Sequence, residues 1–237
     1  MMRKALCILL LVVAAGSFLY IGLWYVGGQR RQESDRAFAQ RFHQALSVNE
    51  QSPPAASASA STNLAGPPSN LSPFATLYKE IPDFSGWITL PDSAIDYPVV
   101  QCEDNQRYLT ANAFQAEDTH GAIFLDYRCL PGDGLMILYG HHMKDGTMFA
   151  DVIRYRNSRY HQEHPTFLLY DAQGHLTHYQ VTDNFRWDEQ TATDTPFYEH
   201  MQALRDASGT DILCLATCDY TNGNAHFVVV AEREDVP

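Results

Sequence analysis

The chain has 237 residues, of which 45% are hydrophobic and 12% aromatic. This is enough for one globular domain with an appendage, but too little for two full domains and their linkers. The formal net charge is −12. Because nucleic-acid binders need clustered cations to displace the counterions of phosphates, this charge excludes nucleic acid as a partner.

The N-terminal segment is predicted to be a membrane anchor. Residues 5–26 carry no charge, and a helix at about 1.5 Å per residue would span roughly 33 Å with them, enough to cross a bilayer. Trp24 and Tyr25 close the run at interfacial depth. A cleaved signal peptide is the competing interpretation, supported by the small residues at 14–16 but not by the apolar run that continues past them. Charged residues flank the run on both sides, so charge does not decide its orientation.

The next segment is predicted to be a short helix followed by a tether. Phe38, Phe42 and Leu46 are spaced by four in the polar segment 29–48, which places them on one face of an amphipathic helix. Residues 49–73 are rich in Pro, Ala and Ser and have no apolar periodicity, so ordering them would not repay its entropy cost. We therefore expect three parts: an anchor with its tail, a helix and linker, and a folded domain, at residues 1–28, 29–71 and 72–237.

The folded domain is predicted to be mainly β. Short apolar runs bounded by Gly, Pro, Asp or Asn indicate eight strands, at residues 86–90, 97–100, 122–125, 135–139, 166–170, 178–181, 211–215 and 226–231. Helical stretches are few, at about residues 104–113, 147–156 and 195–207. This pattern favours a closed β-barrel with helices packed outside it over a doubly wound sheet.

Two strand ends carry the residues of a nucleophilic cysteine site. Cys218 ends one apolar run, and His141 and His142 follow another. A thiol and an imidazole are the minimum parts of such a site, and a strand end presents a side chain on a rigid support. Counting along the strand with a period of two places Ala216 and Cys214 on the face of Cys218. Spacing does not choose between His141 and His142.

Two other kinds of site use the same residue types. Zinc could be bound by His141, His142, Cys214 and Cys218, but adjacent residues on an extended backbone point in opposite directions, so the two histidines could not easily share a metal. A papain-like hydrolase would place the cysteine before the histidine in the chain, and here the order is reversed.

The remaining cysteines and the neighbour of Cys218 are predicted to be structural. The spacing of the five cysteines resembles neither a paired zinc motif nor a dense disulfide framework, although a cross-link stays open. We interpret Cys102, Cys129 and Cys214 as small buried hydrophobes. Asp219 is expected to be a loop residue whose side chain points away from Cys218.

The residues resemble a known family at this point. The sequence LATC at 215–218 resembles the signature of sortases, and YGHHMKDGTMF at 139–149 is similar to the histidine segment of class B sortases. Three further segments are similar to the opening of the class B domain and occur in the same order, at residues 83–88, 95–101 and 121–128. The resemblance covers the chain from about residue 77 to its end.

The resemblance implies a sortase-type β-barrel and a membrane-anchored cysteine transpeptidase of a Gram-positive cell surface. It implies a single-pass protein with a cytoplasmic N-terminus and an extracellular catalytic domain. The residues themselves lead us to expect no metal or other cofactor. Its protein partners would carry a C-terminal sorting signal of the LPxTG or NPxTN type. Cys218 would capture the Thr carbonyl as a thioester, with His141 as the general acid and base and His142 structural. The acceptor would be an amine of lipid II or of a pilin lysine.

The sequence departs from the family at the third catalytic position. Class B members often carry an arginine eight residues after the cysteine, where this chain has His226. Arg233 is a poor substitute, because it lies about 23 Å farther along a regular strand and on the opposite face. A neutral imidazole lacks the charge and the two-pronged geometry of a guanidinium. Three interpretations stay open: His226 is a weaker oxyanion donor, Arg128 or Arg186 reaches the site, or the chain is a degenerate sortase that acts as a tethered peptide- or cell-wall-binding module.

Substrate choice would depend on the loop between the sixth and seventh strands. The resemblance places this loop at about residues 182–211 and implies a helix within it. Residues 195–204 fit such a helix, with Pro196 at a first-turn position.

Overall fold

The computed structural model describes residues 2–50, 75–130, 133–188, 196–219 and 225–234. The chain divides into one unit over residues 1–43 and a second over residues 44–237, and each is described by itself. The segment 51–74, which holds most of the predicted Pro/Ala/Ser-rich linker, lies outside the described residues.

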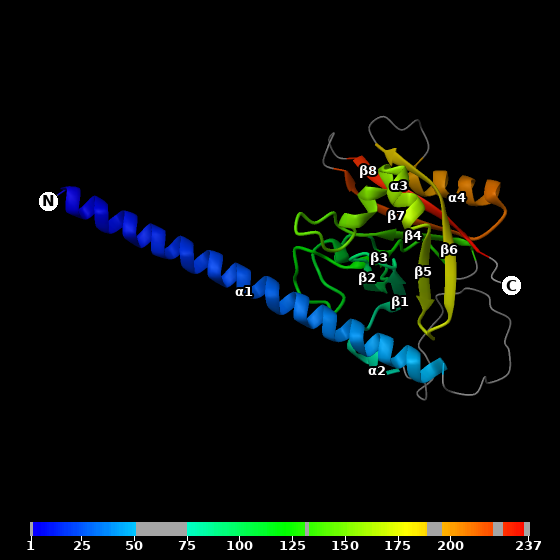
Figure 1. Cartoon of the computed structure of the whole chain (residues 1–237), viewed down its shortest axis with the longest axis horizontal. Coiled ribbons are helices and arrows are strands. Elements are labelled where there is room, and N and C mark those ends of the chain that lie inside the picture. Colours follow the sequence, from blue (N-terminus) through cyan, green and yellow to red (C-terminus); the bar gives the residue numbers. More distant parts are fainter. Residues whose placement is uncertain (1, 51–74, 131–132, 189–195, 220–224, 235–237) are drawn as a thin grey trace. The chain divides into compact units, whose positions relative to one another are not determined.

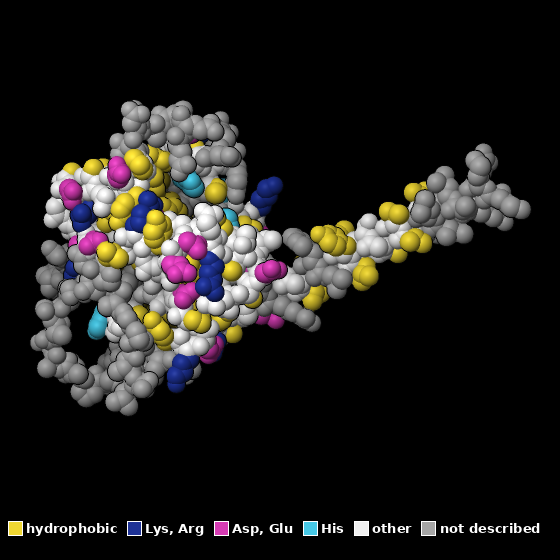
Figure 2. All heavy atoms as spheres, turned by 180° about the vertical axis from the view of Figure 1, so that it is seen from behind, with side chains coloured by type: hydrophobic (Ala, Val, Ile, Leu, Met, Phe, Trp, Pro, Cys, Tyr) yellow, Lys and Arg dark blue, Asp and Glu magenta, His cyan; other side chains and the backbone are white. Residues whose placement is uncertain are grey.

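Residues Met2–Glu50 form one α-helix, α1. The predicted anchor and the predicted amphipathic helix are therefore continuous, because no Pro interrupts the segment between them. Among the described residues, α1 is the one helix long and apolar enough to cross a membrane, by length and composition, over Val12–Ser47. Hydrophobic side chains such as Val12, Phe18 and Tyr20 are exposed along it (Figure 2), as expected of a surface meant for a non-aqueous environment.

The second unit is a closed eight-stranded barrel (Figure 1). Its strands are β1 (Phe84–Thr89), β2 (Asp96–Val100), β3 (Ile123–Leu125), β4 (Leu135–Tyr139), β5 (Thr166–Asp171), β6 (Leu176–Trp187), β7 (Ile212–Asp219) and β8 (Ala225–Arg233). They are hydrogen-bonded in the order β1-β2-β3-β4-β7-β8-β6-β5. The pairs β2–β3 and β4–β7 are parallel, and the others are antiparallel. The prediction of a mainly β, closed barrel is confirmed.

Short helices accompany the barrel. They are α2 (Ala75–Glu80), the 3-10 helices η1 (Arg107–Leu109) and η2 (Ala150–Arg156), α3 (Ser158–Glu163) and α4 (Phe197–Ser208). Asn157 caps α3, because its side chain accepts a hydrogen bond from the backbone N–H of Arg159. Pro196 precedes α4 as its N-cap, and Gly209 ends α4 in the left-handed conformation with φ 71°.

One core joins these elements. All eight strands contribute buried hydrophobic side chains to it, together with η2, α3 and α4. The largest fully buried side chains of this cluster include Tyr155, Phe149 and Phe167. Burying such a side chain contributes roughly 1.5–3 kcal/mol, so the barrel holds its strand ends rigidly.

Two predictions about local structure were wrong. The helix expected at residues 104–113 is only the short turn η1. The Asp104 carboxylate lies at its start and accepts from the backbone N–H groups of Gln106 and Arg107 at 2.7 and 2.9 Å. The chain turns back after Leu109, where Ala111 bridges to Glu117 and the Asn112 side chain accepts from the N–H groups of Phe114 and Ala116. β6 extends to Trp187, well beyond the predicted residue 181, because its polar residues pair with β8. The connection from β6 to β7 therefore begins later than expected.

Candidate active site

The end of β7 carries Cys218. Cys218 pairs directly with His226 of β8 in the antiparallel ladder, and the last pair of this ladder is Asp219 with Ala225. Residues directly opposite each other in such a ladder have side chains on the same face. Cys218 is half-buried, so the residue is supported by the sheet without being fully enclosed.

The end of β4 brings His141 to the same place. β4 and β7 are parallel neighbours, with Tyr139 opposite Ala216, and the Gly140 N–H donates to the Ala216 carbonyl at 3.2 Å. His141 and Cys218 each lie two residues beyond this pair, so both reach the same barrel edge. The Thr217 hydroxyl, itself buried, donates to the Gly140 carbonyl at 2.8 Å and ties the two strand ends together.

The imidazole of His141 interacts with the thiol of Cys218. A hydrogen bond with the Cys218 side chain is the largest cause that raises the pKa of His141 above its usual range. Burial acts in the opposite direction because it disfavours the charged ring, and the Leu109 carbonyl adds to the increase. The structure thus brings together the two residues that the sequence singled out.

The carbonyl of Leu109, in η1, orients His141. Its oxygen lies 2.8 Å from Nε2 of His141, and since a carbonyl only accepts, Nε2 donates. In the neutral ring this leaves Nδ1 without a proton, the form that can accept the proton of a thiol. A backbone oxygen has no residue-type signature, so sequence reasoning did not identify this partner.

His142 makes a different contact. Its Nδ1 lies 3.3 Å from the backbone carbonyl of Cys218, to which it donates, and His142 forms an isolated bridge with Met148. Cys214, the other ligand type considered for zinc, is fully buried, and burial raises its pKa far above the usual range of a thiol. Within the described part of the chain, no group of three or more His, Cys, Asp and Glu residues is arranged to hold a metal ion.

A glycine makes room for the His141 ring. Gly121 has φ +62°, and an added Cβ would overlap the Tyr108 carbonyl oxygen and lie 3.2 Å from Cδ2 of His141. Both the positive φ and the close approach of backbone require glycine here. The backbone at Gly121, just before β3, therefore lies close against the His141 imidazole.

Replacing Gly121 with alanine is expected to lower the free energy of unfolding by roughly 1–3 kcal/mol and to shift the NMR signals of the His141 ring. Gly146→Ala is the matched control, because Gly146 also has a positive φ, +83°, but has open space around it. Denaturant unfolding and NMR spectroscopy would measure both variants. Equal behaviour of the two variants would contradict a specific packing role for Gly121.

His226 lies at the centre of a row across three strands. Cys218 of β7 is its neighbour on one side and Trp187 of β6 on the other. The Trp187 ring packs against Phe197 and His200 of α4, with centroids 5.3 and 4.8 Å apart. The third predicted site residue is thus the direct cross-strand neighbour of Cys218, with α4 alongside.

The arginines considered as substitutes for position 226 lie elsewhere. Arg233 pairs with Tyr179 at the other end of β8, and its guanidinium binds Asp211 at 3.1 Å. Arg186 pairs with Phe227, the neighbour of His226, so its side chain leaves the sheet on the face opposite Cys218.

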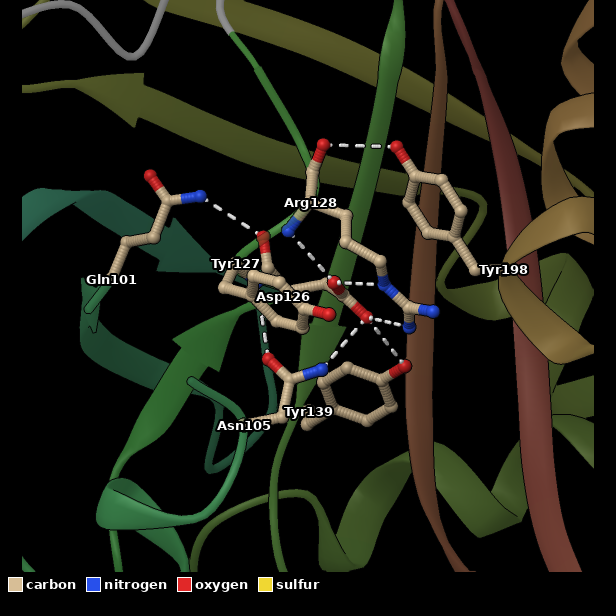
Figure 3. Close-up of polar contacts among 7 residues, drawn as sticks. All are labelled: Gln101, Asn105, Asp126, Tyr127, Arg128, Tyr139 and Tyr198. Carbon is tan, nitrogen blue, oxygen red and sulfur yellow. Dashed lines mark hydrogen bonds and ion pairs between the residues drawn. The ribbon is translucent and has the colours of Figure 1, made fainter. Parts of the chain in front are cut away.

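Arg128 belongs to a separate network around Asp126, which is fully buried. The guanidinium of Arg128 donates to both oxygens of Asp126, at 2.9 and 2.6 Å, and Asn105 and Tyr139 donate to the same carboxylate (Figure 3). Burial raises the pKa of Asp126, but the hydrogen bonds from Arg128 and Asn105 outweigh it and hold the pKa below its usual range. Tyr198 of α4 donates to the Arg128 carbonyl at 2.9 Å, so the network docks α4 onto the barrel.

Two predictions about single side chains were wrong. Asp219 is the last residue of β7 and is 1% exposed, with ion pairs to Arg156 and Arg186, and not a loop residue. Cys102 is half-buried, and its thiol donates to the Asp104 carbonyl at 3.3 Å, whereas Cys129 and Cys214 are buried as predicted. None of the four cysteines that the structure describes in the barrel unit forms a disulfide.

Comparison with known proteins agrees with this geometry. The family model of the sortase domain matches residues 88–234. Sortase B of Listeria monocytogenes is 35% identical over 158 residues, which are 58% of this chain and 63% of that protein, so the match spans less than two thirds of the relative's length. Sortase B of Staphylococcus aureus is 28% identical over 179 residues, 67% of this chain and 73% of the relative.

Solved structures give the same result. Clostridium perfringens sortase B has a TM-score of 0.59 and 28% identity, and the match covers 68% of this chain and 98% of that chain. A Staphylococcus aureus sortase B–substrate complex has a TM-score of 0.67 at 23% identity, covers 88% of this chain and 98% of that chain, and so supports the fold. The barrel topology, the converging thiol and imidazole, and these matches lead to one conclusion: the chain belongs to the sortase family and is similar to its class B members.

Proposed function

We propose that this protein is a class B sortase-like cysteine transpeptidase, with Cys218 as the nucleophile and His141 as the general acid and base. The observation that carries the proposal is the convergence of the ends of β4 and β7, where the Cys218 side chain is the largest cause of the raised pKa of His141 and the Leu109 carbonyl binds Nε2 of the ring. A nucleophile bound to a base that is itself oriented by a third group is the arrangement of covalent catalysis.

The reaction has two acyl-transfer steps. The Cys218 sulfur attacks the Thr carbonyl carbon of a sorting signal of the LPxTG or NPxTN type, and the tetrahedral intermediate collapses to a thioester while His141 protonates the departing amine. An incoming amine then attacks the thioester, gives its proton to His141 and releases the Cys218 thiolate. The new amide joins the substrate protein to lipid II or to a pilin lysine.

His226 is proposed to stabilise the oxyanion of both tetrahedral intermediates. It is the cross-strand neighbour of Cys218, so an N–H of its ring is on the face where the negative oxygen develops. A donor placed there stabilises the transition state more than the ground state. An imidazole offers one donor when neutral and two when protonated, fewer than the guanidinium of the family's usual arginine.

The rest of the chain is proposed to tether this domain. Residues 1–28 form a cytoplasmic tail and a single-pass membrane anchor, residues 29–71 form a helix and linker outside the cell, and residues 72–237 form the catalytic domain. The exposed apolar surface of α1 supports the anchor. This arrangement would keep the domain within reach of membrane-bound lipid II and of proteins that carry a sorting signal.

Trapping the covalent intermediate tests the proposal. The full chain in detergent is incubated with LPxTG and NPxTN peptides, with and without a glycine-based amine, and analysed by intact mass and peptide mapping. We expect an acyl adduct on Cys218 that the amine converts to a transpeptidation product. Cys218→Ala should abolish the adduct, and Cys102→Ala, which removes another accessible thiol of the barrel unit, should retain it.

The same experiment separates the enzyme from its alternative. His226 at the position of the family's arginine is the observation that favours a degenerate sortase acting as a binding module. Binding of the peptides without an adduct on Cys218, at several pH values and with several peptides, would contradict the transpeptidase and support the module.

A further inference from the structure

A buried carboxylate lies directly beside the nucleophile. Asp219 follows Cys218 in β7, and its side chain is 1% exposed. Its oxygen Oδ2 binds a terminal nitrogen of the Arg156 guanidinium, and Nε of Arg186 lies 3.3 Å from the same oxygen. Arg186 also lies 3.4 Å from Asp188. A buried charge is otherwise costly, and the two arginines offset that cost for the Asp219 carboxylate.

Three elements meet at this cluster, which consists of Asp219, Arg156 and Arg186. Arg156 ends η2 and stacks its guanidinium over the Phe227 ring of β8 at 4.9 Å. Arg186 lies on β6, where it pairs with Phe227. The cluster therefore sits on the sheet face opposite Cys218, within one residue of it along the strand, and does not touch the reacting atoms.

The charges around the thiol determine what this cluster does. Among the described residues, the titratable or charged side chains near Cys218 or its strand end include His141, His142, His226, Asp219, Arg156, Arg186 and Asp188. A nearby carboxylate opposes the formation of a thiolate, and a nearby cation favours it. Arginine keeps its charge at every relevant pH, whereas the imidazole present at position 226 is not a permanent cation.

We propose that Arg156 and Arg186 are positioning residues that set the reactivity of the Cys218 thiol by neutralising Asp219 from the opposite face of the sheet. This inference rests on the proposed role of Cys218 and extends it to three further residues. In this chain the permanently charged cations near the nucleophile are Arg156 of η2 and Arg186 of β6. Position 226 of β8 supplies none, because it is a histidine. The cluster also holds together the strand ends that place Cys218 opposite His226.

Alkylation of the thiol tests this without any sorting peptide. The rate of Cys218 modification by iodoacetamide is measured in the full chain from pH 5 to 10 by peptide mapping. The midpoint is the pH at which the alkylation rate reaches half of its maximum. We expect this midpoint to rise by roughly 0.5–1 pH unit in Arg156→Gln and in Arg186→Gln, and to fall by a similar amount in Asp219→Asn, since about one nearby charge changes in each case. The double variant Arg156→Gln/Asp219→Asn should return close to the wild-type midpoint.

The opposite signs distinguish electrostatics from loss of structure, because loosening the strand ends would move every variant in the same direction. Arg156→Lys keeps the charge and should keep the midpoint even if its stability falls. Arg159→Gln removes a guanidinium that is 83% exposed and should change nothing. Midpoints that stay within about 0.2 pH unit of wild type in all folded variants, or that move the same way in Asp219→Asn and Arg156→Gln, would overturn the proposal. If the midpoints shift with the expected signs but the chain forms no acyl adduct with a sorting peptide, the proposed function is overturned and the proposed role of the two arginines is not.

Discussion

Replacing His141 with glutamine is expected to lower the rate of transpeptidation by roughly 10²–10⁴-fold, the range associated with loss of a general acid and base. Glutamine keeps a hydrogen-bonding group of similar size, but it cannot accept the thiol proton or return it to the leaving amine. Single-turnover assays with a fluorogenic sorting peptide would measure the acylation step. His142→Gln is the matched control: it removes the adjacent imidazole, which contacts the Cys218 carbonyl and not its sulfur.

The titration of His141 provides a second readout in the same variants. The hydrogen bond with the Cys218 side chain is the largest cause that raises the pKa of His141, and burial lowers it. In Cys218→Ala the first contribution disappears and the second remains, so the NMR titration midpoint of His141 should fall relative to wild type. An unchanged midpoint in Cys218→Ala, or equal rates in His141→Gln and His142→Gln, would contradict the assigned roles.

Replacing His226 with alanine is expected to slow turnover by roughly tenfold to several hundredfold, because loss of a single oxyanion donor costs on the order of 10²–10³ in a strong case and an imidazole is the weaker kind of donor. His226→Arg should retain or raise the rate, since a guanidinium adds charge and a second donor. The rate should fall in kcat with little change in KM, because the contact forms only in the transition state.

The control for position 226 is an exposed histidine of the same barrel. His175 has a side chain that is 74% exposed, and His175→Ala should leave kcat unchanged. Equal rates for wild type and His226→Ala would remove His226 from the mechanism. A large gain in His226→Arg combined with no loss in His226→Ala would show that this chain works without a donor at this position and that the family's arginine can be restored.

The register of β7 and β8 determines which residue lies opposite the thiol. Position 226 is opposite Cys218 because β7 and β8 pair along their whole length, from Ile212 with Glu232 to Asp219 with Ala225. A side chain at that position faces the thiol whatever its type. The position of residue 226 relative to the thiol therefore depends on the barrel, and we propose that the residue type there adjusts how strongly the oxyanion is bound.

Local sequence patterns were sufficient for most of the architecture. Alternating or continuous apolar runs bounded by turn residues predicted the eight strands, because each strand has to bury side chains with a period of two or on both faces. The polar half of β6 escaped detection because its pairing with β8, and not its own hydrophobicity, makes residues 182–187 a strand. The helix predicted at 104–113 stops after one turn because the chain folds back there, with Ala111 bridged to Glu117 and the Asn112 side chain bound to the backbone of Phe114 and Ala116.

The sequence by itself determined which residues can do chemistry: a thiol at position 218 and an imidazole at 141, each at the end of an apolar run, together with an N-terminal segment long and apolar enough to span a bilayer. Only the tertiary structure decided their partners. The Leu109 carbonyl beside His141 and the burial of Asp219 between two arginines join residues distant in sequence, and the register of β7 against β8 places Cys218 opposite His226. Such contacts depend on strand order and register around a closed barrel, which no local pattern of residue types records.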